Sequence, residues 1–429
     1  MIFTKKSLER FPRLMLFDMD LGGHHGSYIQ HLIEYWYKQE LRGSLEIVVR
    51  PEFLQIHSDP VKLAAEYQLS NIQFTVITQD EAKTLNAGRS SLDRFTRNFQ
   101  RWKLFCKYAT QCKATHALHL YFDTCELPLA FGIGAPCPFS GIYFRPTFHY
   151  GEFEGYTPSW QDRLQQFKEK IILTRVLQHP QLTTLFCLDP FAVKQFDRFH
   201  TQVNVVHLAD PVQLEDRSGI APAQLQSQLG IAPNRQILLL FGALSRRKGI
   251  DELLDAISLL PTDMCSQICL LLVGGTNAVE QARIQAQVAQ VCQTHPVQIV
   301  EHYDFVPEDH VSVYFQLADI VLTPYQRHVG MSGILLLAAV AGKPVLSSDY
   351  GLMGELVRRY QLGLAVDTTS PIEIAKALSR CLVDIPATLG DRSQMQIFVE
   401  QNSIDRYAST IFQNLDRQID RTSIEIGAK

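Results

Sequence analysis

The chain has 429 residues, of which 46% are hydrophobic and 20% are charged, and its formal net charge at pH 7 is −4. This length suffices for roughly two to three domains with apolar cores, and the charge balance argues against a protein that binds nucleic acid through general electrostatics. No stretch reaches about 18 uninterrupted apolar residues, and the first residues lack the apolar run of a signal peptide, so we expect a cytoplasmic protein.

The cysteines argue against two further classes of protein. There are nine, an odd number, and none forms a Cys-x-x-Cys pair, which suits reduced thiols inside cores. The sequence therefore predicts neither a disulfide framework nor a zinc site.

Short apolar runs and helical stretches alternate through the first half of the chain. The run Arg13–Phe17 leads through a glycine-containing loop into a helix from about Ser27 to Gln39. This alternation is typical of a parallel sheet with crossover helices. Further elements are predicted at Leu45–Val49, Phe74–Ile77, His116–Tyr121, Phe139–Phe144, Thr184–Cys187 and Val203–His207 for strands, and at about Trp160–Leu177 for a long helix.

The alternation begins again after a linker at Leu208–Pro211. We therefore expect a first doubly wound α/β domain over residues 1–207 and a second over 208–399, with an amphipathic helix at about 400–420 packing back on the first. The strands expected in the second domain are Gln236–Phe241, Ile268–Val273, Val297–Val300, Asp319–Leu322 and Pro344–Ser347.

A glycine-containing segment, Pro324–Gly333, separates a predicted buried strand from Ile334–Ala341, which is apolar all round as a buried helix is. Ser332 is placed to cap that helix, and Gly330 and Gly333 let the backbone come close to a ligand. The free amides and the dipole of a helix N-terminus favour an anion there. Taken alone, the segment also fits an ordinary strand–helix turn.

Five motifs occur in the order and spacing of the nucleotide-sugar domain of GT-B glycosyltransferases. They are Phe241–Ile250 (FGALSRRKGI), Leu271–Gly275 (LLVGG), Asp304–Glu308 (DFVPE), Ala318–Tyr325 (ADIVLTPY) and Ala341–Val345 (AGKPV). The chain resembles the group 1, or family 4, retaining glycosyltransferases over about residues 236–350, and less closely over the N-terminal half.

The resemblance implies an α/β protein of the GT-B fold, in which two Rossmann-like doubly wound domains face each other across a cleft. It also implies transfer of a hexose from a nucleotide-diphosphate sugar to a sugar, lipid or small-molecule acceptor, with retention at the anomeric carbon. This family neutralises the departing diphosphate with side chains and backbone amides, so we expect neither a metal ion nor a cofactor.

The resemblance also assigns residues to the donor. Arg247 and Lys248 stand where the family has its diphosphate-binding pair, although a charged pair after a strand also fits a solvated turn. The predicted diphosphate-binding residues are Arg247, Lys248, Gly22, Gly23, Gly330, Met331, Ser332 and Gly333. The predicted nucleotide-binding residues are Gly242, Gly274, Phe305 and Glu355.

The chain departs from the family at two glutamates, whose positions are taken by Val329 and Leu337. The second family glutamate holds the donor ribose hydroxyls, so the apolar pair removes hydrogen-bonding anchors. Either the ribose is held differently, with Glu355 as a candidate replacement, or donor recognition is altered, or activity is lost. We therefore keep a second class of function, a catalytically inactive GT-B-like binding or partner protein.

The acceptor is expected in the first domain, where family members commonly place a histidine just after a strand. His149 is the catalytic candidate, with His119, His24 and His25 as rivals, and a lone histidine also fills structural roles. Arg145 would bind an acidic or phosphorylated acceptor group, or form a salt bridge. We assign acceptor binding to Arg145 and His25.

The segment Ser90–Lys113 has Leu92, Phe95, Phe99 and Trp102 at helical spacing among basic residues. One interpretation is a helix that lies on an anionic membrane, which would make the protein peripheral to the cytoplasmic membrane. The other is a domain helix whose aromatic stripe packs on the sheet.

Overall fold

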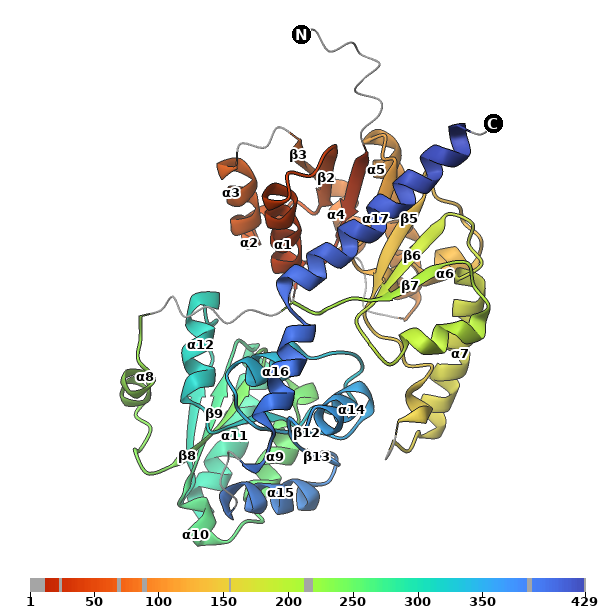
Figure 1. Cartoon of the computed structure of the whole chain (residues 1–429). Helices are drawn as coiled ribbons and strands as arrows, with labels where there is room; N and C mark the ends of the chain where they lie inside the picture. Colours follow the sequence, from red (N-terminus) through yellow and green to blue (C-terminus); the bar gives the residue numbers. More distant parts are fainter. Residues whose placement is uncertain are drawn as a thin grey trace. The chain divides into compact units, whose positions relative to one another are not determined.

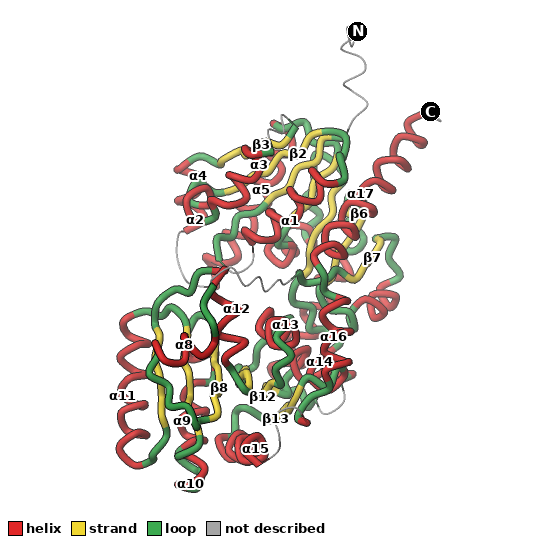
Figure 2. Tube along the Cα trace, turned by 60° about the vertical axis from the view of Figure 1, so that its left-hand side comes forward, coloured by secondary structure: helices red, strands yellow, loops and turns green. Residues whose placement is uncertain are grey.

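A computed structural model describes residues 12–22, 25–67, 71–86, 91–153, 156–211, 219–383 and 388–427. Two compact units share the chain, and each is built on one sheet flanked by helices (Figures 1 and 2). Unit 1 takes Met1–His149, Ser159–Pro211 and Ile404–Lys429, and unit 2 takes Tyr150–Pro158 and Val212–Ser403. The segment Tyr150–Pro158, which the sequence analysis placed in the first domain, thus belongs to unit 2.

Unit 1 contains, among its described residues, a seven-stranded sheet of order β3-β2-β1-β4-β5-β6-β7. All neighbouring strands are parallel, so the predicted parallel α/β alternation is confirmed. The strands are β1 (Arg13–Phe17), β2 (Ser44–Val49), β3 (Ile72–Val76), β4 (His116–His119), β5 (Phe139–Tyr143), β6 (Leu182–Cys187) and β7 (Asn204–His207).

Helices cover both faces of this sheet because successive strand residues point to opposite sides. Met15 and Phe17 of β1 enter the core under α4, α5, α6 and α7, whereas Leu14 and Leu16 enter the core under α1, α2, α3 and α17. The helices are α1 (His25–Lys38), α2 (Phe53–Ile56), α3 (Ser58–Glu66), α4 (Gln79–Asn86), α5 (Ser91–Gln111), α6 (Glu126–Ala130), α7 (Trp160–Val176) and α17 (Ile404–Gly427).

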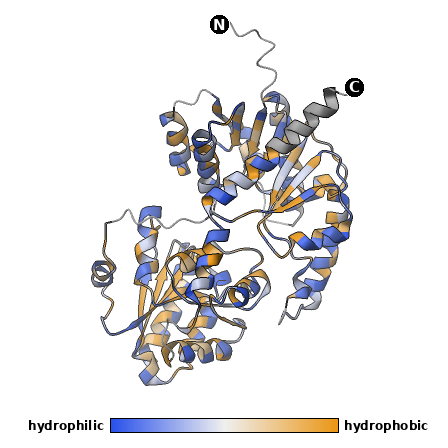
Figure 3. Cartoon of the chain, in the orientation of Figure 1, coloured by the Kyte–Doolittle hydropathy of each residue, from blue (hydrophilic) through white to orange (hydrophobic). Residues whose placement is uncertain are grey.

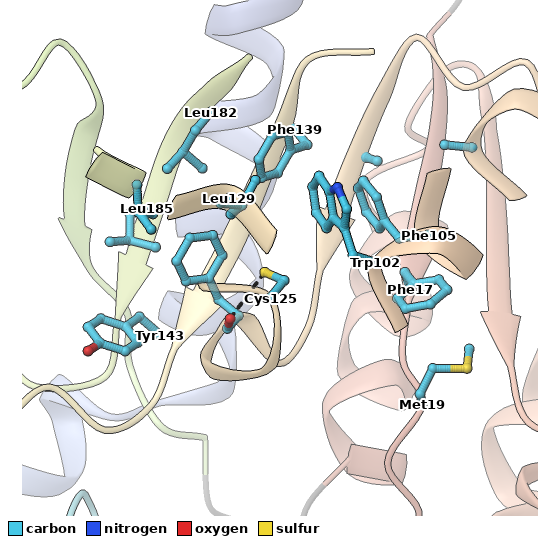
Figure 4. Close-up of a cluster of buried hydrophobic side chains, with 14 of the residues drawn as sticks. Phe17, Met19, Trp102, Phe105, Cys125, Leu129, Phe139, Tyr143, Leu182 and Leu185 are labelled. Carbon is cyan, nitrogen blue, oxygen red and sulfur yellow. Dashed lines mark hydrogen bonds between the residues drawn. The ribbon is translucent and has the colours of Figure 1, made fainter. Parts of the chain in front are cut away.

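The helix predicted around Ser90–Lys113 is α5, and it is a domain helix over its second half. Trp102 is 1% exposed and its ring stacks on Phe105 at 4.7 Å and meets the edge of Phe139 at 5.2 Å (Figure 4). Phe95, near the start, is 40% exposed. The packing interpretation is therefore right for Trp102, and the side chain of Leu92 lies outside the described residues.

The terminal helix predicted at about 400–420 corresponds to α17, and a break after Gln401 separates it from a preceding helix, α16 (Arg392–Gln401). Asn402 ends α16, and its side-chain amide donates to the carbonyl of Phe398 at 2.8 Å. Beyond this break, Phe412 of α17 packs against Trp36 of α1 in unit 1. Phe398 packs against Tyr360 in unit 2 instead.

The described part of unit 2 has a six-stranded parallel sheet of order β10-β9-β8-β11-β12-β13. The edge strand β13 (Gly363–Val366) was not predicted, because it is short, begins with glycine and is only half-buried. The other strands are β8 (Gln236–Phe241), β9 (Ile268–Val273), β10 (Gln298–His302), β11 (Ile320–Thr323) and β12 (Val345–Ser348).

The helices of unit 2 also lie on both faces of their sheet (Figure 2). Ile250, Leu253 and Leu254 of α9 share a core with Leu238 and Leu240 of β8. The helices are α8 (Pro222–Gln228), α9 (Ile250–Ile257), α10 (Thr262–Cys265), α11 (Ala278–Thr294), α12 (Glu308–Leu317), α13 (Gly333–Val340), α14 (Gly351–Arg359) and α15 (Pro371–Val383), together with α16.

Gly141 of β5 tests how tightly unit 1 is packed. A Cβ atom at Gly141 would overlap the ring of Phe122, which is fully buried. We expect Gly141→Ala to lower the free energy of unfolding by about 1–3 kcal/mol, as overpacking does, in urea denaturation. Gly134→Ala is the control, since its Cβ would meet only Gln181 at 3.4 Å. Equal stability of the two variants would contradict this packing.

Candidate functional site

Ligands of open α/β sheets bind at the carboxyl ends of strands, where the strand order reverses. In unit 2 that point lies between β8 and β11, which are neighbours in the sheet. The loop after β8 carries Arg247 and Lys248, and the loop after β11 carries the glycine turn. Both predicted diphosphate-binding segments therefore leave adjacent strands at the switch point.

The two loops are pressed together. The backbone N–H of Gln326 donates to the carbonyl of Arg247 at 2.8 Å. Gly249 has φ +70°, and a Cβ there would overlap the carbonyl oxygen of Pro324. Glycine is therefore needed at this position both for its conformation and for the close approach.

Lys248 lies at the centre of the site. It ends a short 3₁₀ turn, Arg246–Lys248, and is only 5% exposed. Its Nζ donates to the carbonyl of Phe241 at 3.0 Å and to the hydroxyl of Tyr325. Both partners are uncharged oxygens, and no carboxylate among the described residues pairs with this ammonium group. Gly242 leaves room for it, since a Cβ there would lie 3.1 Å from Nζ.

Arg247 is exposed and is joined to the glycine turn through His328. Its guanidinium donates to Nδ1 of His328 at 2.8 Å, so Nε2 of that ring carries the proton and donates to the carbonyl of Met331 at 3.2 Å. The guanidinium also lies 5.6 Å from the ring centre of Tyr325. The structure thus brings Arg247, Lys248 and Met331 into one region.

The turn ends at the N-terminus of α13. Ser332 occupies the N-cap position, but the prediction that its side chain caps the helix is wrong, because it makes no capping hydrogen bond. Its carbonyl accepts from Leu335 N–H at 3.0 Å instead. The first N–H groups of a helix have no partner within it, so the amides around Gly333 suit an anion.

Tyr150, which was not predicted as a site residue, packs under the glycine turn and contacts its backbone. Tyr150 is fully buried in unit 2, and its hydroxyl accepts the backbone N–H of Gly330, whose φ is +96°, at 3.1 Å. The Tyr150 ring lies so close to Gly351 that a Cβ there would come within 2.5 Å of it. It also packs against Phe153 and Tyr156. The cluster of aromatic residues in this segment could have indicated a buried residue here, but not its contact with Gly330.

The predicted nucleotide-binding residues lie at three places in unit 2. Gly242 and Gly274 follow adjacent strands, and a Cβ at Gly274, where φ is +138°, would overlap the carbonyl of Gly242. Phe305, after β10, is 84% exposed. Glu355 lies in α14, is 7% exposed and is paired with Arg359 at 2.9 Å and with Arg358 at 3.8 Å. Glu355 is therefore a buried and ion-paired side chain of α14.

In unit 1 the strand order reverses between β1 and β4, and polar side chains gather where β1 ends. His25, at the start of α1, donates from Nδ1 to Asp18 at 2.7 Å. Arg101 of α5 forms two hydrogen bonds to Asp20, at 2.7 and 3.0 Å. Gly22 is exposed in the same loop, and Gly23 and His24 lie outside the described residues.

The charges in this loop determine its protonation. Burial lowers the pKa of His25, but the Asp18 carboxylate and its hydrogen bond outweigh burial, so this pKa is raised. Burial raises the pKa of Asp20, but the Arg101 guanidinium outweighs it, so this pKa is lowered. Both shifts favour the charged forms, the imidazolium of His25 and the carboxylate of Asp20.

The two predicted acceptor-binding residues share an aromatic neighbour. The His25 ring meets Tyr121 edge-on at 5.6 Å, and the guanidinium of Arg145 lies 5.4 Å from the Tyr121 ring centre. Arg145 also pairs with Asp123 at 3.5 Å, and its side chain is half exposed. His25 and Arg145 thus lie around Tyr121 at the carboxyl ends of β1, β4 and β5.

The other histidine candidates are enclosed. Nε2 of His149 lies 3.1 Å from Asp189, and their side chains are 1% and 0% exposed. Burial lowers the pKa of His119 to about 3, and its Nδ1 accepts the N–H of Tyr121 at 3.3 Å. Of the three described histidine candidates, only His25 keeps part of its ring accessible.

One described group of side chains could be mistaken for a metal site. Potential ligand atoms of Asp18, Asp20 and His25 lie within 4.8 Å of one another. Asp18 already binds the ring of His25, however, and Arg101 binds both oxygens of Asp20. The expectation of a metal-independent protein stays a prediction.

Comparison with protein families finds a match in the second half of the chain. Residues 223–413 match the model described as "Glycosyl transferases group 1". This stretch of the chain is therefore similar to the group 1 glycosyltransferases. Among the described residues, no helix is both long and apolar enough to cross a membrane.

Curated relatives agree over part of their length. A lipopolysaccharide 1,2-N-acetylglucosaminetransferase of Salmonella typhimurium is 29% identical over 185 residues, which cover 42% of this chain and 46% of that protein. A D-inositol 3-phosphate glycosyltransferase of Jonesia denitrificans is 25% identical over 255 residues, covering 58% and 56%. The chain thus spans about half the length of these relatives.

Solved structures establish the fold over nearly the whole chain. HepE of Anabaena, solved with UDP and glucose, has a TM-score of 0.63 at 15% identity and covers 95% of this chain and 100% of its own. Sucrose-phosphate synthase of Thermosynechococcus elongatus has a TM-score of 0.67 at 18% identity and covers 96% and 100%. The chain therefore has the predicted GT-B fold.

The hydroxyl of Tyr150 is a direct test of the site as described. We expect Tyr150→Phe to lower the free energy of unfolding of unit 2 by about 1–3 kcal/mol, because it leaves the buried N–H of Gly330 without its acceptor. Urea denaturation measures this change. Tyr303→Phe is the control, since it removes a hydroxyl that binds the half-buried Glu301 at the edge strand β10. An unchanged Tyr150→Phe protein would show that the Gly330 contact is not formed.

Proposed function

We propose that the protein is an active glycosyltransferase that moves a hexose from a nucleotide-diphosphate sugar to an acceptor, with retention. One observation carries the proposal. Lys248 is buried at the switch point of unit 2 with only neutral oxygens as partners. Burying a charge without a counter-charge destabilises the folded protein. A diphosphate bound beside Lys248 would supply the missing counter-charge and offset this destabilisation.

The surroundings of Lys248 also suit a diphosphate. Arg247 adds a second positive charge that makes no ion pair among the described residues, and the N-terminal amides of α13 add donors. We assign Gly330, Met331, Ser332 and Gly333 to the same anion. HepE has been solved with UDP and with UDP-glucose, which supports a nucleotide sugar as the donor here.

The proposed reaction needs no more than these groups. The acceptor oxygen forms a bond to the anomeric carbon, the bond from that carbon to the diphosphate breaks, and the acceptor proton passes to an oxygen of the departing diphosphate. Negative charge then accumulates on the leaving group, where Arg247, Lys248 and the α13 amides stabilise it. In this proposal neither a metal ion nor a cofactor takes part.

The nucleoside end of the donor would lie against the remaining predicted residues. Gly242 and Gly274 present backbone without side chains, and the exposed ring of Phe305 is available for stacking. Leu337 is 8% exposed in α13 and offers no hydrogen bond to the ribose. We propose Glu355 for that role, with its carboxylate paired to Arg358 and Arg359.

Unit 1 would hold the acceptor. His25 and Arg145 place positive charge around Tyr121, which supports an acceptor with an acidic or phosphorylated group. The name of the Jonesia relative includes a phosphorylated acceptor, D-inositol 3-phosphate. Because His149 is enclosed with Asp189, we transfer the position beside the reacting carbon from His149 to His25.

A double variant tests the donor site. Charge-assisted hydrogen bonds are worth about 1.5–3 kcal/mol each, so Arg247→Ala with Lys248→Ala should weaken the binding of UDP or GDP by several kcal/mol. Isothermal titration calorimetry measures this loss, and far-UV circular dichroism checks the fold.

The matched control is Lys376→Ala with Arg380→Ala, two exposed basic residues of α15 in the same unit. It should bind nucleotide as the unchanged protein does. Unchanged affinity in the Arg247 and Lys248 variant would exclude this site. Tight nucleotide binding without sugar transfer from any donor would favour the inactive binding protein instead.

A further inference from the structure

Helix α7 of unit 1 exposes a row of large apolar side chains. Trp160 is 72% exposed, Leu164 44%, Phe167 62% and Ile171 49%. Their spacing of four, three and four residues places them along one face of the helix. Contiguous apolar surface of this kind marks an interaction site in a protein in water.

This row is not the face by which α7 packs on its own unit. Leu173 and Val176 are buried in the core with Leu185 of β6. Glu169, on the same inner side, is buried and accepts hydrogen bonds from Tyr143 at 2.7 Å and from Thr147. The helix therefore has two apolar faces, and Figure 3 shows hydrophobic and hydrophilic residues alternating along it.

Positive charge flanks the exposed row on both sides. At about 100° per residue, Arg163 and Lys170 fall to one side of the row, and Lys168 and Arg175 fall to the other. All four are exposed. The acids of α7 lie on the opposite side of the helix, where Asp162 is held in the capping box with Ser159.

The layer that contains α7 exposes further apolar side chains. Phe131, directly after α6, is 65% exposed, and Ile133 is 41% exposed. Phe99 of α5 lies 5.9 Å from Phe131. Helices α5, α6 and α7 pack on the same face of the sheet. The apolar surface of this layer is thus not limited to one helix.

We propose that the α7 face of unit 1 docks on an anionic lipid bilayer. The row Trp160, Leu164, Phe167 and Ile171 enters the boundary between headgroups and acyl chains, while Arg163, Lys168, Lys170 and Arg175 meet lipid phosphates. Their long side chains reach the headgroups while the apolar row is inserted.

Charge decides between this occupant and a second copy of the chain. In a symmetric pair, each α7 row would face the other row, and the basic residues flanking them would lie close to one another. Like charges at such a distance repel. The lipid phosphates of an anionic membrane place negative charge beside the basic residues that flank the inserted row. The inference does not depend on the donor site.

The fluorescence of Trp160 can report on the binding of α7 to lipid. It has three tryptophans, of which Trp36 and Trp102 are buried and Trp160 is exposed. Adding vesicles of phosphatidylcholine and phosphatidylglycerol in equal parts should shift the tryptophan emission of the full chain to the blue, and the protein should sediment with them. Vesicles of phosphatidylcholine alone should do neither. Trp160→Phe should remove the shift and keep the sedimentation.

Two variants separate the contributions. Phe167→Ser with Ile171→Ser, and Lys168→Glu with Lys170→Glu, should each weaken vesicle binding by about tenfold or more. Lys38→Glu with Lys62→Glu makes the same charge change on exposed residues of α1 and α3, on the opposite face of the sheet, and should bind like the unchanged protein apart from a small loss from net charge.

The proposal is overturned if anionic vesicles neither shift the emission nor sediment the protein. It is also overturned if the Lys168 and Lys170 variant binds as well as the control variant. A blue shift that grows with protein concentration in the absence of lipid would show that a second copy covers the row instead.

Discussion

The site in unit 2 depends on one buried positive charge. Lys248 is almost completely buried from solvent, and its Nζ donates hydrogen bonds to the Phe241 carbonyl and the Tyr325 hydroxyl. Two neutral oxygens do not replace a counter-ion, so the free energy of this arrangement improves when an anion binds. Glycine is needed at positions 242 and 249 for the same arrangement. A Cβ atom at Gly242 would crowd Lys248, and one at Gly249 would overlap the neighbouring loop.

The two units differ in how the basic side chains at their strand ends are paired. Unit 2 leaves Lys248 and Arg247 without acids among their described neighbours, which suits a highly charged donor. In unit 1 the described basic groups His25 and Arg145, near the ends of β1 and β5, are paired with carboxylates, His25 with Asp18 and Arg145 with Asp123. The weaker net field there suits an acceptor of lower charge, held by hydrogen bonds and by the face of Tyr121.

Patterns that are local in sequence could be predicted, and contacts between distant segments could not. The buried strands of both sheets were predicted because runs such as Gln236–Phe241 are continuous and apolar, whereas β13 is short and begins with Gly363. The order and spacing of the five motifs led to the prediction that Arg247 and Lys248 bind the diphosphate. No pattern shows that Tyr150 supports Gly330, 180 residues away, or that His149 is enclosed by Asp189. The break at Asn402 depends on one side-chain cap, which periodicity does not show.

The central claim is that a nucleotide diphosphate lies between the loop after β8 and the N-terminus of α13. Hydrogen–deuterium exchange of the full chain with and without saturating UDP, or GDP if only GDP binds, tests this claim most directly. The account predicts slower exchange in the peptides that contain Arg246–Gly249 and Gly330–Leu336, and no change in α15. Binding that protects other segments and leaves both of these peptides unchanged would contradict the account.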